Sequence, residues 1–201
     1  MMTLDAGEYF HLALHAVRQN DHHAALQYLK QVLALEPDNA AAHYLMAAEH
    51  AELGLFDRAI QGMEEALALR PDLEIARFQL GLLHLQGNRT QQASTAFQAL
   101  ESMATDSALL AFARAYLALI SDLPAEAVPW LEQGIAQCDN NPSLKADMNR
   151  VLDSVRQKLE PAPAESLTTS PENTDPEKGL PASVLFLGAY RDSLKDENDP
   201  H

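Results

Sequence analysis

The sequence contains one cysteine, Cys138, and no long apolar run. A single cysteine excludes an intramolecular disulfide and fits a reducing compartment. No stretch approaches the roughly 20 consecutive apolar residues that a membrane-spanning helix needs. The first residues include acids where a secretory signal peptide would have Lys or Arg. These absences predict a soluble, cytoplasmic protein without a membrane span.

Basic residues are scarce, since the chain has 14 Lys and Arg against 29 Asp and Glu and a formal net charge of −15. Nucleic acids and anionic membrane surfaces are bound through basic patches, so the composition argues against both as partners. A protein or peptide partner of basic or apolar character is expected instead.

Val and Ile are also few, because the hydrophobic 47% of the chain consists mainly of Ala and Leu. Ala and Leu favour helices, whereas strands are rich in β-branched residues. With 201 residues, the chain has room for one domain of ordinary size and a tail. An all-α protein is therefore predicted.

A 34-residue period runs through the first two-thirds of the chain. Two sets of residues recur every 34 positions, and each is called a column below. They are the alanines Ala25, Ala59, Ala93 and Ala127, and the aromatic residues Phe10, Tyr44, Phe78 and Phe112. The aromatic column carries more weight, because the chain has only one Trp, five Tyr and six Phe. Internal repeats of this length indicate a solenoid of stacked units.

Each period has the pattern of two helices separated by a turn. Gly54 and Gly87 stand at that turn, where glycine supplies the left-handed conformation that follows many helices. Pro37 and Pro71, each followed by Asp, end two of the pairs, because proline cannot continue a helix and aspartate caps the next one. The alanine column is expected to be buried where the two helices of a repeat cross.

The sequence resembles the tetratricopeptide repeat, a 34-residue helix–turn–helix unit with an A-x3-F element in its second helix. The element is present as Ala25/Leu29, Ala59/Met63, Ala93/Phe97 and Ala127/Leu131. The resemblance implies an all-α, right-handed superhelix of four repeats, at about 6–39, 40–73, 74–107 and 108–141. The fourth repeat is the least regular, with Arg114 where Leu is expected, Asp139 where Pro is expected, and Pro129 inside its second helix.

The rest of the chain divides into three segments. Residues 143–159 are expected to form a C-terminal capping helix that completes a superhelix over residues 1–159. Residues 160–179 are rich in Pro, Ser, Thr and acids, which predicts a disordered linker. Residues 180–201 form a tail with an apolar recognition segment made by Val184, Leu185, Phe186, Leu187 and Tyr190.

In the family, four positions on the first helix of each repeat point into a concave groove, and the resemblance assigns such a groove to this chain. The expected peptide-binding residues are Phe10, Leu14, Val17, Tyr44, Ala48, Ile75, Phe78, Leu82, Leu85, Leu109, Phe112 and Tyr116. None is Lys, Arg or Asn, with which some members of the family grip a C-terminal carboxylate. The expected groove is a nearly continuous apolar channel, and its ligand an apolar or amphipathic helix or strand.

The sequence therefore predicts a scaffold for protein–protein interaction, and its own tail is one candidate ligand of the groove. Two alternatives remain open. One is a secretion-type chaperone that shields an apolar segment of a client. The other is a self-assembly module, a homo-oligomer in which the tail of one copy enters the groove of another.

No catalytic or metal-binding constellation is recognised in the sequence. His11 and His15 have the i, i+4 spacing of two metal ligands on one helix face, but no third ligand follows at a recognisable spacing. His50 and His84 share one repeat position and are expected to be packing residues. Cys138 has no evident base partner. We therefore expect no metal, no cofactor and no enzymatic activity.

Overall fold

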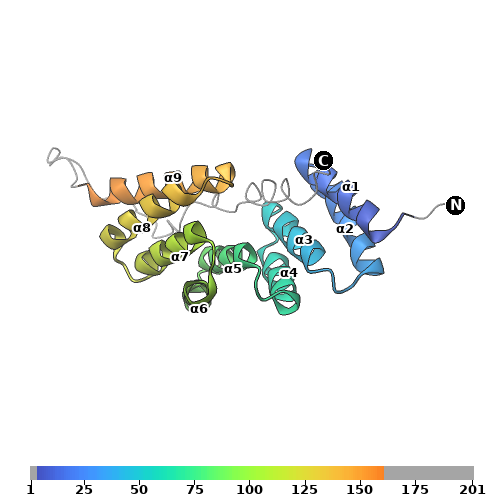
Figure 1. The fold of residues 1–201 in the computed structure, drawn as a ribbon, viewed down its shortest axis with the longest axis horizontal. Helices are drawn as coiled ribbons and strands as arrows, with labels where there is room; N and C mark the ends of the chain where they lie inside the picture. Colours follow the sequence, from blue (N-terminus) through green and yellow to red (C-terminus); the bar gives the residue numbers. More distant parts are fainter. Residues whose placement is uncertain (1–3, 161–201) are drawn as a thin grey trace, which may run out of the picture.

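The computed structural model describes residues 4–160, which fold into nine α-helices and contain no strand (Figure 1). In chain order the helices are α1 (Ala6–Arg18), α2 (His22–Leu35), α3 (Ala40–Glu52), α4 (Phe56–Leu69), α5 (Glu74–Gln86), α6 (Thr90–Met103), α7 (Ser107–Ile120), α8 (Pro124–Gln137) and α9 (Pro142–Leu159). The all-α repeat fold that the composition and the period predict is confirmed.

The helices form pairs that follow one another along a curved stack (Figure 1). Within the pairs, α1 packs on α2, α3 on α4, α5 on α6 and α7 on α8, and each pair contacts the next. In Figure 1, α3 and α5 lie on the inner side of the curve, and α4 and α6 lie on the outer side. α9 packs on α8 and follows where the first helix of a fifth period would start.

The turn inside each pair contains one residue in the left-handed conformation. These residues are Asn20, Gly54, Asn88 and Asp122, with φ of 58°, 72°, 55° and 58°. They follow the 34-residue step, and Asn, Asp and Gly adopt this conformation at the least cost. The expectation is correct for Gly54 and wrong for Gly87, which has a φ of −83° because Asn88 takes the left-handed position.

Side-chain caps begin most of the inner helices. Asp5, Asn39 and Asp106 accept backbone amides at the start of α1, α3 and α7, and Asn141 does so for α9. Asp5 and Glu8 form a reciprocal capping box. A cap stabilises a helix by about 0.5–2 kcal/mol, so short-range contacts help to set where these helices start.

Small residues stand where the helices of a pair approach closely. One column of them is fully buried, as expected: Ala25, Ala59, Ala93 and Ala127. Gly81 lies so close to Phe97 that a Cβ there would sit 2.6 Å from the ring. Gly134 has the same relation to the ring of Phe112. Neither glycine leaves room for a side chain unless the ring moves.

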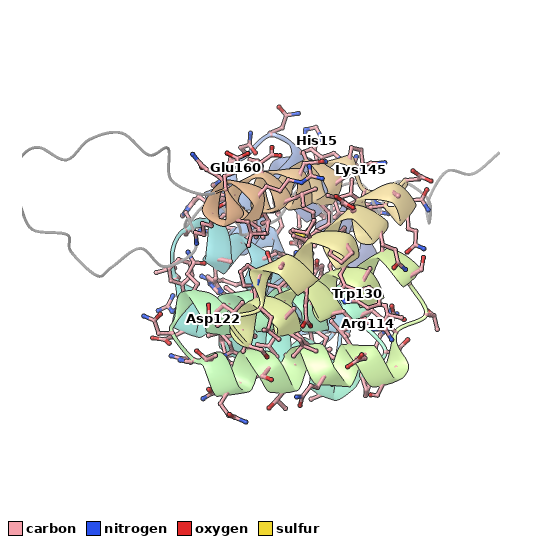
Figure 2. All side chains as sticks on the ribbon, turned by 90° about the vertical axis from the view of Figure 1, so that its left-hand side faces the viewer. His15, Arg114, Asp122, Trp130, Lys145 and Glu160 are labelled. Atoms are coloured by element: carbon pink, nitrogen blue, oxygen red, sulfur yellow. The ribbon has the colours of Figure 1, made fainter. Side chains whose placement is uncertain are left out.

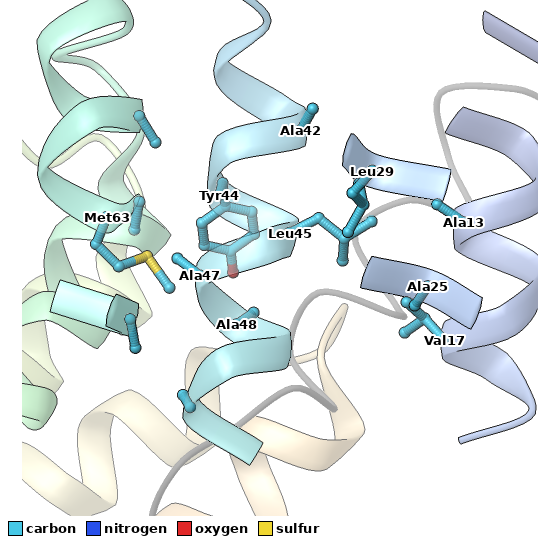
Figure 3. Packing of buried hydrophobic residues seen from close by; sticks show 14 of the residues in the cluster. Ala13, Val17, Ala25, Leu29, Ala42, Tyr44, Leu45, Ala47, Ala48 and Met63 are labelled. Carbon is cyan, nitrogen blue, oxygen red and sulfur yellow. The ribbon is translucent and has the colours of Figure 1, made fainter. Parts of the chain in front are cut away.

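The buried apolar side chains form two clusters that meet at α5. The N-terminal cluster joins α1–α5 and consists mainly of Ala, Leu and Val around Tyr44 (Figure 3). The C-terminal cluster joins α5–α9 and contains four buried aromatic rings: Phe78, Phe97, Phe112 and Tyr116. α5 belongs to both, since it supplies Leu80 to the first cluster and Phe78 to the second.

The fourth pair accommodates the residues that depart from the family pattern. α8 runs through Pro129, although proline removes one amide hydrogen bond from a helix interior. Arg114 and Trp130 lie side by side (Figure 2), with the guanidinium carbon 4.8 Å from the ring centre. The Arg114 Nε also donates to Glu101 at 3.0 Å. A cation–π contact between α7 and α8 therefore occupies the place where the family has Leu.

Two predicted segments, the linker 160–179 and the tail 180–201, lie outside the described residues except for Glu160. The capping helix predicted at 143–159 is observed as α9, Pro142–Leu159. Within residues 4–160, none of the helices combines the length and the apolar character that a membrane span requires.

Candidate peptide-binding surface

The expected groove residues lie on the inner helices α1, α3, α5 and α7. Most of them are buried: Leu14, Val17, Tyr44, Ala48, Phe78, Leu82, Leu109, Phe112 and Tyr116. Phe10, Ile75 and Leu85 are half-buried. Burial therefore dominates at the expected groove positions, and three of the side chains keep accessible surface. Peptide binding along them stays a prediction.

Four aromatic rings of the C-terminal cluster contact one another. The ring centre of Phe78 lies 5.7 Å from that of Phe97, 5.8 Å from that of Tyr116 and 6.2 Å from that of Phe112. Phe97 and Tyr116 stack at 5.2 Å with an interplanar angle of 13°. These are distances of favourable aromatic pairs, so Phe78, Phe112 and Tyr116 support the packing of the helices. Burial also raises the pKa of the Tyr116 phenol, which keeps it neutral.

An open cleft lies where the N-terminal ends of α5, α7 and α9 come together. It encloses about 460 Å³, within the range of ligand pockets. Ile75, Leu109 and Leu144 give it apolar side chains, and the first two of these are expected groove residues. The remaining lining comes from the end of α8, from the start of α7 and from two connections between helices, residues 105–106 and 138–141.

Acidic groups stand beside the apolar part of this cleft. Asp106 caps α7, because one of its carboxylate oxygens accepts the amides of Ala108 and Leu109 at 2.8 and 3.1 Å. Asp139 lies in the connection between α8 and α9, and its carboxylate is 3.4 Å from the amine of Lys145. The lining contains both carboxylates and no Lys or Arg, which makes the cleft acidic.

Glu74, the first residue of α5, holds one wall of the cleft in place. Its carboxylate accepts the amide and the hydroxyl of Thr105, both at 2.7 Å, and the amide of Asp106 at 3.0 Å. Partial burial raises the pKa of Glu74, but these hydrogen bonds outweigh it and hold the pKa below its usual value. Thr105 stands one period after Pro71, so hydrogen bonds fix this connection where an earlier one has proline.

Cys138 lines the cleft and is buried. Its thiol donates to the carbonyl oxygen of Asn141 at 3.5 Å. Burial, with the nearby Asp106 carboxylate, raises the pKa of the thiol, which makes it a weak nucleophile at neutral pH. The sequence pattern does not reveal this cleft. The one available signal is the missing proline at Thr105 and Asp139, because such connections need other contacts to fix their path.

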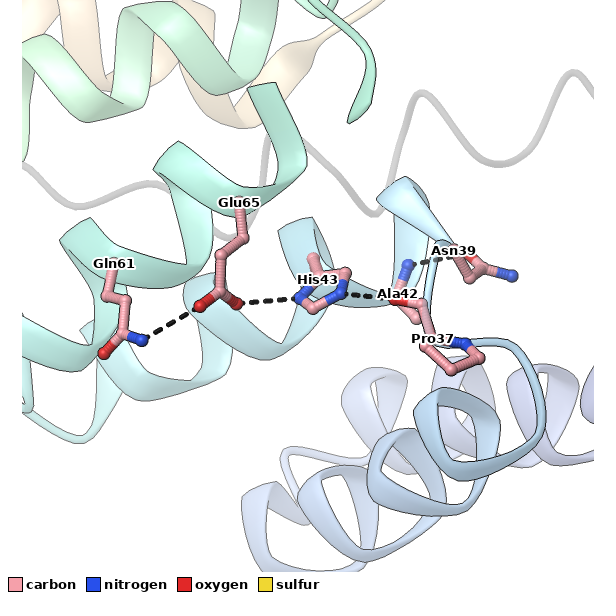
Figure 4. A network of polar contacts seen from close by, with 6 residues as sticks. All are labelled: Pro37, Asn39, Ala42, His43, Gln61 and Glu65. Atoms are coloured by element: carbon pink, nitrogen blue, oxygen red, sulfur yellow. Dashed lines mark hydrogen bonds and ion pairs between the residues drawn. The ribbon is translucent and has the colours of Figure 1, made fainter. Parts of the chain in front are cut away.

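A side-chain hydrogen bond to a proline carbonyl oxygen recurs at one repeat position of the inner helices. His43 donates from one ring nitrogen to the carbonyl oxygen of Pro37 at 2.8 Å, and its other ring nitrogen is 3.0 Å from the Glu65 carboxylate (Figure 4). One period later, Arg77 donates to the carbonyl oxygen of Pro71 at 2.9 Å. Each of these hydrogen bonds holds the connection from the preceding pair against the next inner helix.

His11 and His15 are exposed on α1, at the N-terminal end of the stack. Their counterparts one period later, Leu45 and Glu49, are buried. The difference arises because the described part of the chain has no helix before α1 to cover them. Among the residues that the structure describes, no group of three or more His, Cys, Asp and Glu side chains is placed to hold a metal ion.

Two family models for the tetratricopeptide repeat match the chain, at residues 16–72 and 78–142. The matches include residues of both hydrophobic clusters and reach all four helix pairs. This chain therefore belongs to the tetratricopeptide repeat family. No curated protein matches the sequence.

Several solved structures share the fold at low sequence identity. MamA from Desulfovibrio magneticus RS-1, from residue 41 to its end, has a TM-score of 0.58 and 20% identity over 79% of this chain and 92% of that chain. A thermophilic tetratricopeptide repeat protein of Thermus thermophilus has a TM-score of 0.60 and 16% identity over 76% and 82% of the two chains. At such identities the likeness shows the fold alone.

An O-GlcNAc transferase mutant of Thermobaculum terrenum also matches, with a TM-score of 0.57 and 22% identity over 71% of this chain but only 28% of that chain. Tetratricopeptide repeats are generally scaffolds for protein–protein interaction and not enzymes. The match covers a minor part of the transferase, so nothing of its chemistry is carried over to this chain.

Proposed function

We propose that this protein binds an apolar or amphipathic segment of another polypeptide along the inner helices α1, α3, α5 and α7. The observation that carries the proposal is the chemistry of those helices, because none of the expected groove positions is Lys, Arg or Asn. A site for a free carboxylate needs such residues, whereas an apolar surface suits an apolar helix or strand.

α9 marks the end of this apolar surface. It takes the place of a fifth inner helix, but one period after Tyr116 and Leu119 it has Arg150 and Asp153. Both charged residues are exposed. A polar, exposed face is typical of the element that ends a solenoid. A bound segment would therefore lie against the four helix pairs and stop at α9.

Contact with a partner would begin at the inner-helix residues that are only half-buried: Phe10, Ile75, Leu85 and Leu119. These side chains keep exposed apolar area, and removing it from water is worth about 25 cal/mol per Å² before the costs of association. Phe78 and Tyr116 are poor probes of binding, since their ring contacts support the fold. A test of the surface therefore uses the half-buried residues.

The tail of the same chain is one candidate ligand. Its apolar cluster, residues 184–190, lies outside the described residues. If the roughly 24 residues between Glu160 and Leu185 are flexible, as the sequence predicts, their root-mean-square span is about 27 Å, near the about 27 Å length of α9 that the tail must retrace. Such a tether gives an effective concentration on the order of 1 mM. A partner would then have to displace the tail.

The test uses full-length protein in which Phe186→Asp and Leu187→Asp weaken the tail. This variant is expected to bind more apolar dye than the unaltered protein and to bind a fluorescent peptide of residues 180–197. Adding Leu85→Asp should lower the affinity for the peptide. Leu35→Asp is the matched control, because Leu35 is 55% exposed at the end of α2, an outer helix.

Circular dichroism shows whether each variant keeps its helices. A lower peptide affinity for Leu85→Asp than for Leu35→Asp, at equal helix content, supports the inner surface as the binding site. Equal affinity for the two variants would show that the peptide binds elsewhere. Equal dye signals with and without the tail changes would remove the tail as a ligand while leaving other partners to be tried on the same surface.

A further inference from the structure

The cleft at the ends of α5, α7 and α9 has two chemically different sides. Its apolar side consists of the half-buried Ile75 and the buried Leu109 and Leu144, and its acidic side consists of Asp106 and Asp139. A side chain that contacts both needs an apolar stem and a cationic head, as Arg and Lys have. Arg fits better, because its planar guanidinium group offers five donors and can bond more than one carboxylate.

The acidic side is only weakly neutralised by a neighbouring base. Lys145 is the cation beside Asp139, but the side chain of Asp139 is 81% exposed and the charged atoms are 3.4 Å apart. An exposed pair of this kind contributes little and leaves room for a second cation. Asp106 adds a second carboxylate to the lining. Two carboxylates therefore line a cleft that has one lysine beside it, and their charge opposes the positive ends of the three helices that meet there.

The chain itself carries a residue of the required kind. Arg191 directly follows the apolar cluster 184–190, whereas Lys178 and Lys195 stand apart from that cluster. If the cluster lies along the inner helices, the next residue reaches the end of the apolar surface. The cleft borders that surface, because Ile75 and Leu109 belong to both, and it reaches α9 through Leu144.

We propose that Arg191 of the chain's own tail occupies this cleft and anchors the tail on the inner surface. Its stem lies against Ile75, the half-buried apolar residue of the lining, and its guanidinium group lies between Asp106 and Asp139. The inference rests on the proposed function and deepens it, since it names the polar contact that fixes where an apolar segment binds. A competing partner then carries an apolar cluster followed directly by Arg.

The length of the chain permits this contact without a second copy. The cleft lies at the N-terminal end of α9, and Glu160 follows the other end of this 18-residue helix, about 27 Å away. About 30 residues separate Glu160 from Arg191, and a flexible chain of that length has a root-mean-square span of about 30 Å.

Cys138 provides a reporter, because the single cysteine of the protein lines the same cleft. Asp192→Cys in the full-length chain keeps Arg191 and places a second thiol beside it. Mild oxidation with copper–phenanthroline joins two nearby thiols in a disulfide. We expect an intramolecular crosslink, seen by non-reducing electrophoresis at every protein concentration, that forms about tenfold faster than with Lys178→Cys.

Charge reversal tests the role of Arg191 itself. In the Asp192→Cys protein, Arg191→Glu is expected to slow the crosslink by about tenfold, and the matched control Lys195→Glu by less than about twofold. Adding Asp139→Lys to Arg191→Glu should raise the rate by more than Asp139→Lys does in the presence of Arg191, because the two charges are exchanged, whereas the effect of Asp139 on the pKa of the Cys138 thiol is common to both proteins. Equal rates for the two Glu variants, or no rescue by Asp139→Lys, would overturn the proposal.

A thiol at the other end of the apolar cluster separates this inference from the proposed function. Faster crosslinking by Ser183→Cys than by Asp192→Cys would mean that the tail lies in the opposite direction, so that the surface stands but Arg191 is not its anchor. Disulfide-linked dimers in place of the intramolecular product would overturn the assignment to the chain's own tail. Loss of both the crosslink and the dye effect would remove the tail from the surface altogether.

Discussion

The N-terminal and C-terminal clusters fill the same repeat positions with different side chains. In the first two pairs, the residue four places after the column alanine is Leu29 or Met63, and both are buried. On the inner helices α1 and α3, Ala13 and Ala47 share another repeat position, and both are buried as well (Figure 3). The N-terminal cluster thus distributes its contacts over many small and medium side chains.

The third pair has a large aromatic ring at the position of Leu29 and Met63, and a glycine at the position of Ala13 and Ala47. Phe97 takes the position of Leu29, and Gly81 takes the position of Ala13. Phe97 also stacks on Tyr116 and contacts Phe78. Volume is exchanged between two helices while the backbone register stays the same, as expected for cores of constant packing density. The C-terminal cluster therefore concentrates its buried area in a few rings.

The largest expected effect comes from removing one of those rings. Phe97→Ala should lower the free energy of unfolding by about 3–5 kcal/mol, because the ring is fully buried and contacts two others. Leu29→Ala, the matched change in the N-terminal cluster, should cost about 2–3 kcal/mol. Urea denaturation measures both. A larger loss for Leu29→Ala would contradict the difference between the clusters.

The pairing of Gly81 with Phe97 can be tested by a double-mutant cycle. Gly81→Ala should destabilise the protein by about 1–3 kcal/mol, because the new Cβ would meet the Phe97 ring, and this cost outweighs the better helix propensity of Ala. In a Phe97→Leu background the same change should be neutral or stabilising, since it recreates the Ala13–Leu29 combination. Additive effects of the two changes would show that the residues are not coupled.

The N-terminal cluster has its own close contact at the alanine column. Ala59→Leu should overpack the crossing of α3 and α4 and cost about 1–3 kcal/mol, because Ala59 is fully buried. Ala68→Leu is the control, since Ala68 is exposed on the same helix. Thermal unfolding compares the two variants. An unchanged melting temperature for Ala59→Leu would argue that the column does not mark a close crossing.

The smallest expected effect is on the pH dependence of the unfolding free energy. It comes from two histidines at equivalent repeat positions, one on α3 and one on α5. Burial is the leading cause that lowers the pKa of both His50 and His84 below 6.5. Arg58 and Lys30 lower the pKa of His50 further, whereas Glu64 partly opposes the shift at His84 and Arg89 adds to it.

As pH falls below about 6.5, the unfolded chain binds protons at these histidines before the folded chain does. The stability they contribute is present above that pH and is lost as pH falls toward the lowered pKa. His84→Gln should therefore flatten the decline of the unfolding free energy between about pH 7 and 5. His23→Gln, at an exposed position, is the control. Parallel curves for His84→Gln and the unaltered protein would contradict the assignment.

Much of the fold could be predicted from residues close in sequence. The capping helix was expected at 143–159 and is observed at Pro142–Leu159, because Asn141 caps it and its apolar residues recur at helical spacing. Gly87 shows the limit of such reasoning. Glycine permits the left-handed conformation, but so does the adjacent Asn88, and only the path of the chain decides which of the two adopts it.

Less of the candidate site was predictable. The pattern placed the groove residues on the inner helices, where they are, but it did not show that most of them are buried. It identified Ile75 and Leu109 without the cleft that they share with Asp106 and Asp139. Those residues come from different helices and connections, and no local rule relates their positions.

The sequence by itself determined the period, the helix pairs and the apolar chemistry of the inner helices. The helix pairs and the apolar chemistry depend on residues within one turn or one 34-residue unit, which contact one another however the units stack. The period is the recurrence of these residues along the chain. Only the tertiary structure decided which side chains stay accessible, where the cleft opens, and that Glu74 holds the connection at Thr105. These features depend on how neighbouring units approach, and that distance is set by the volumes of side chains about 30 residues apart in the chain.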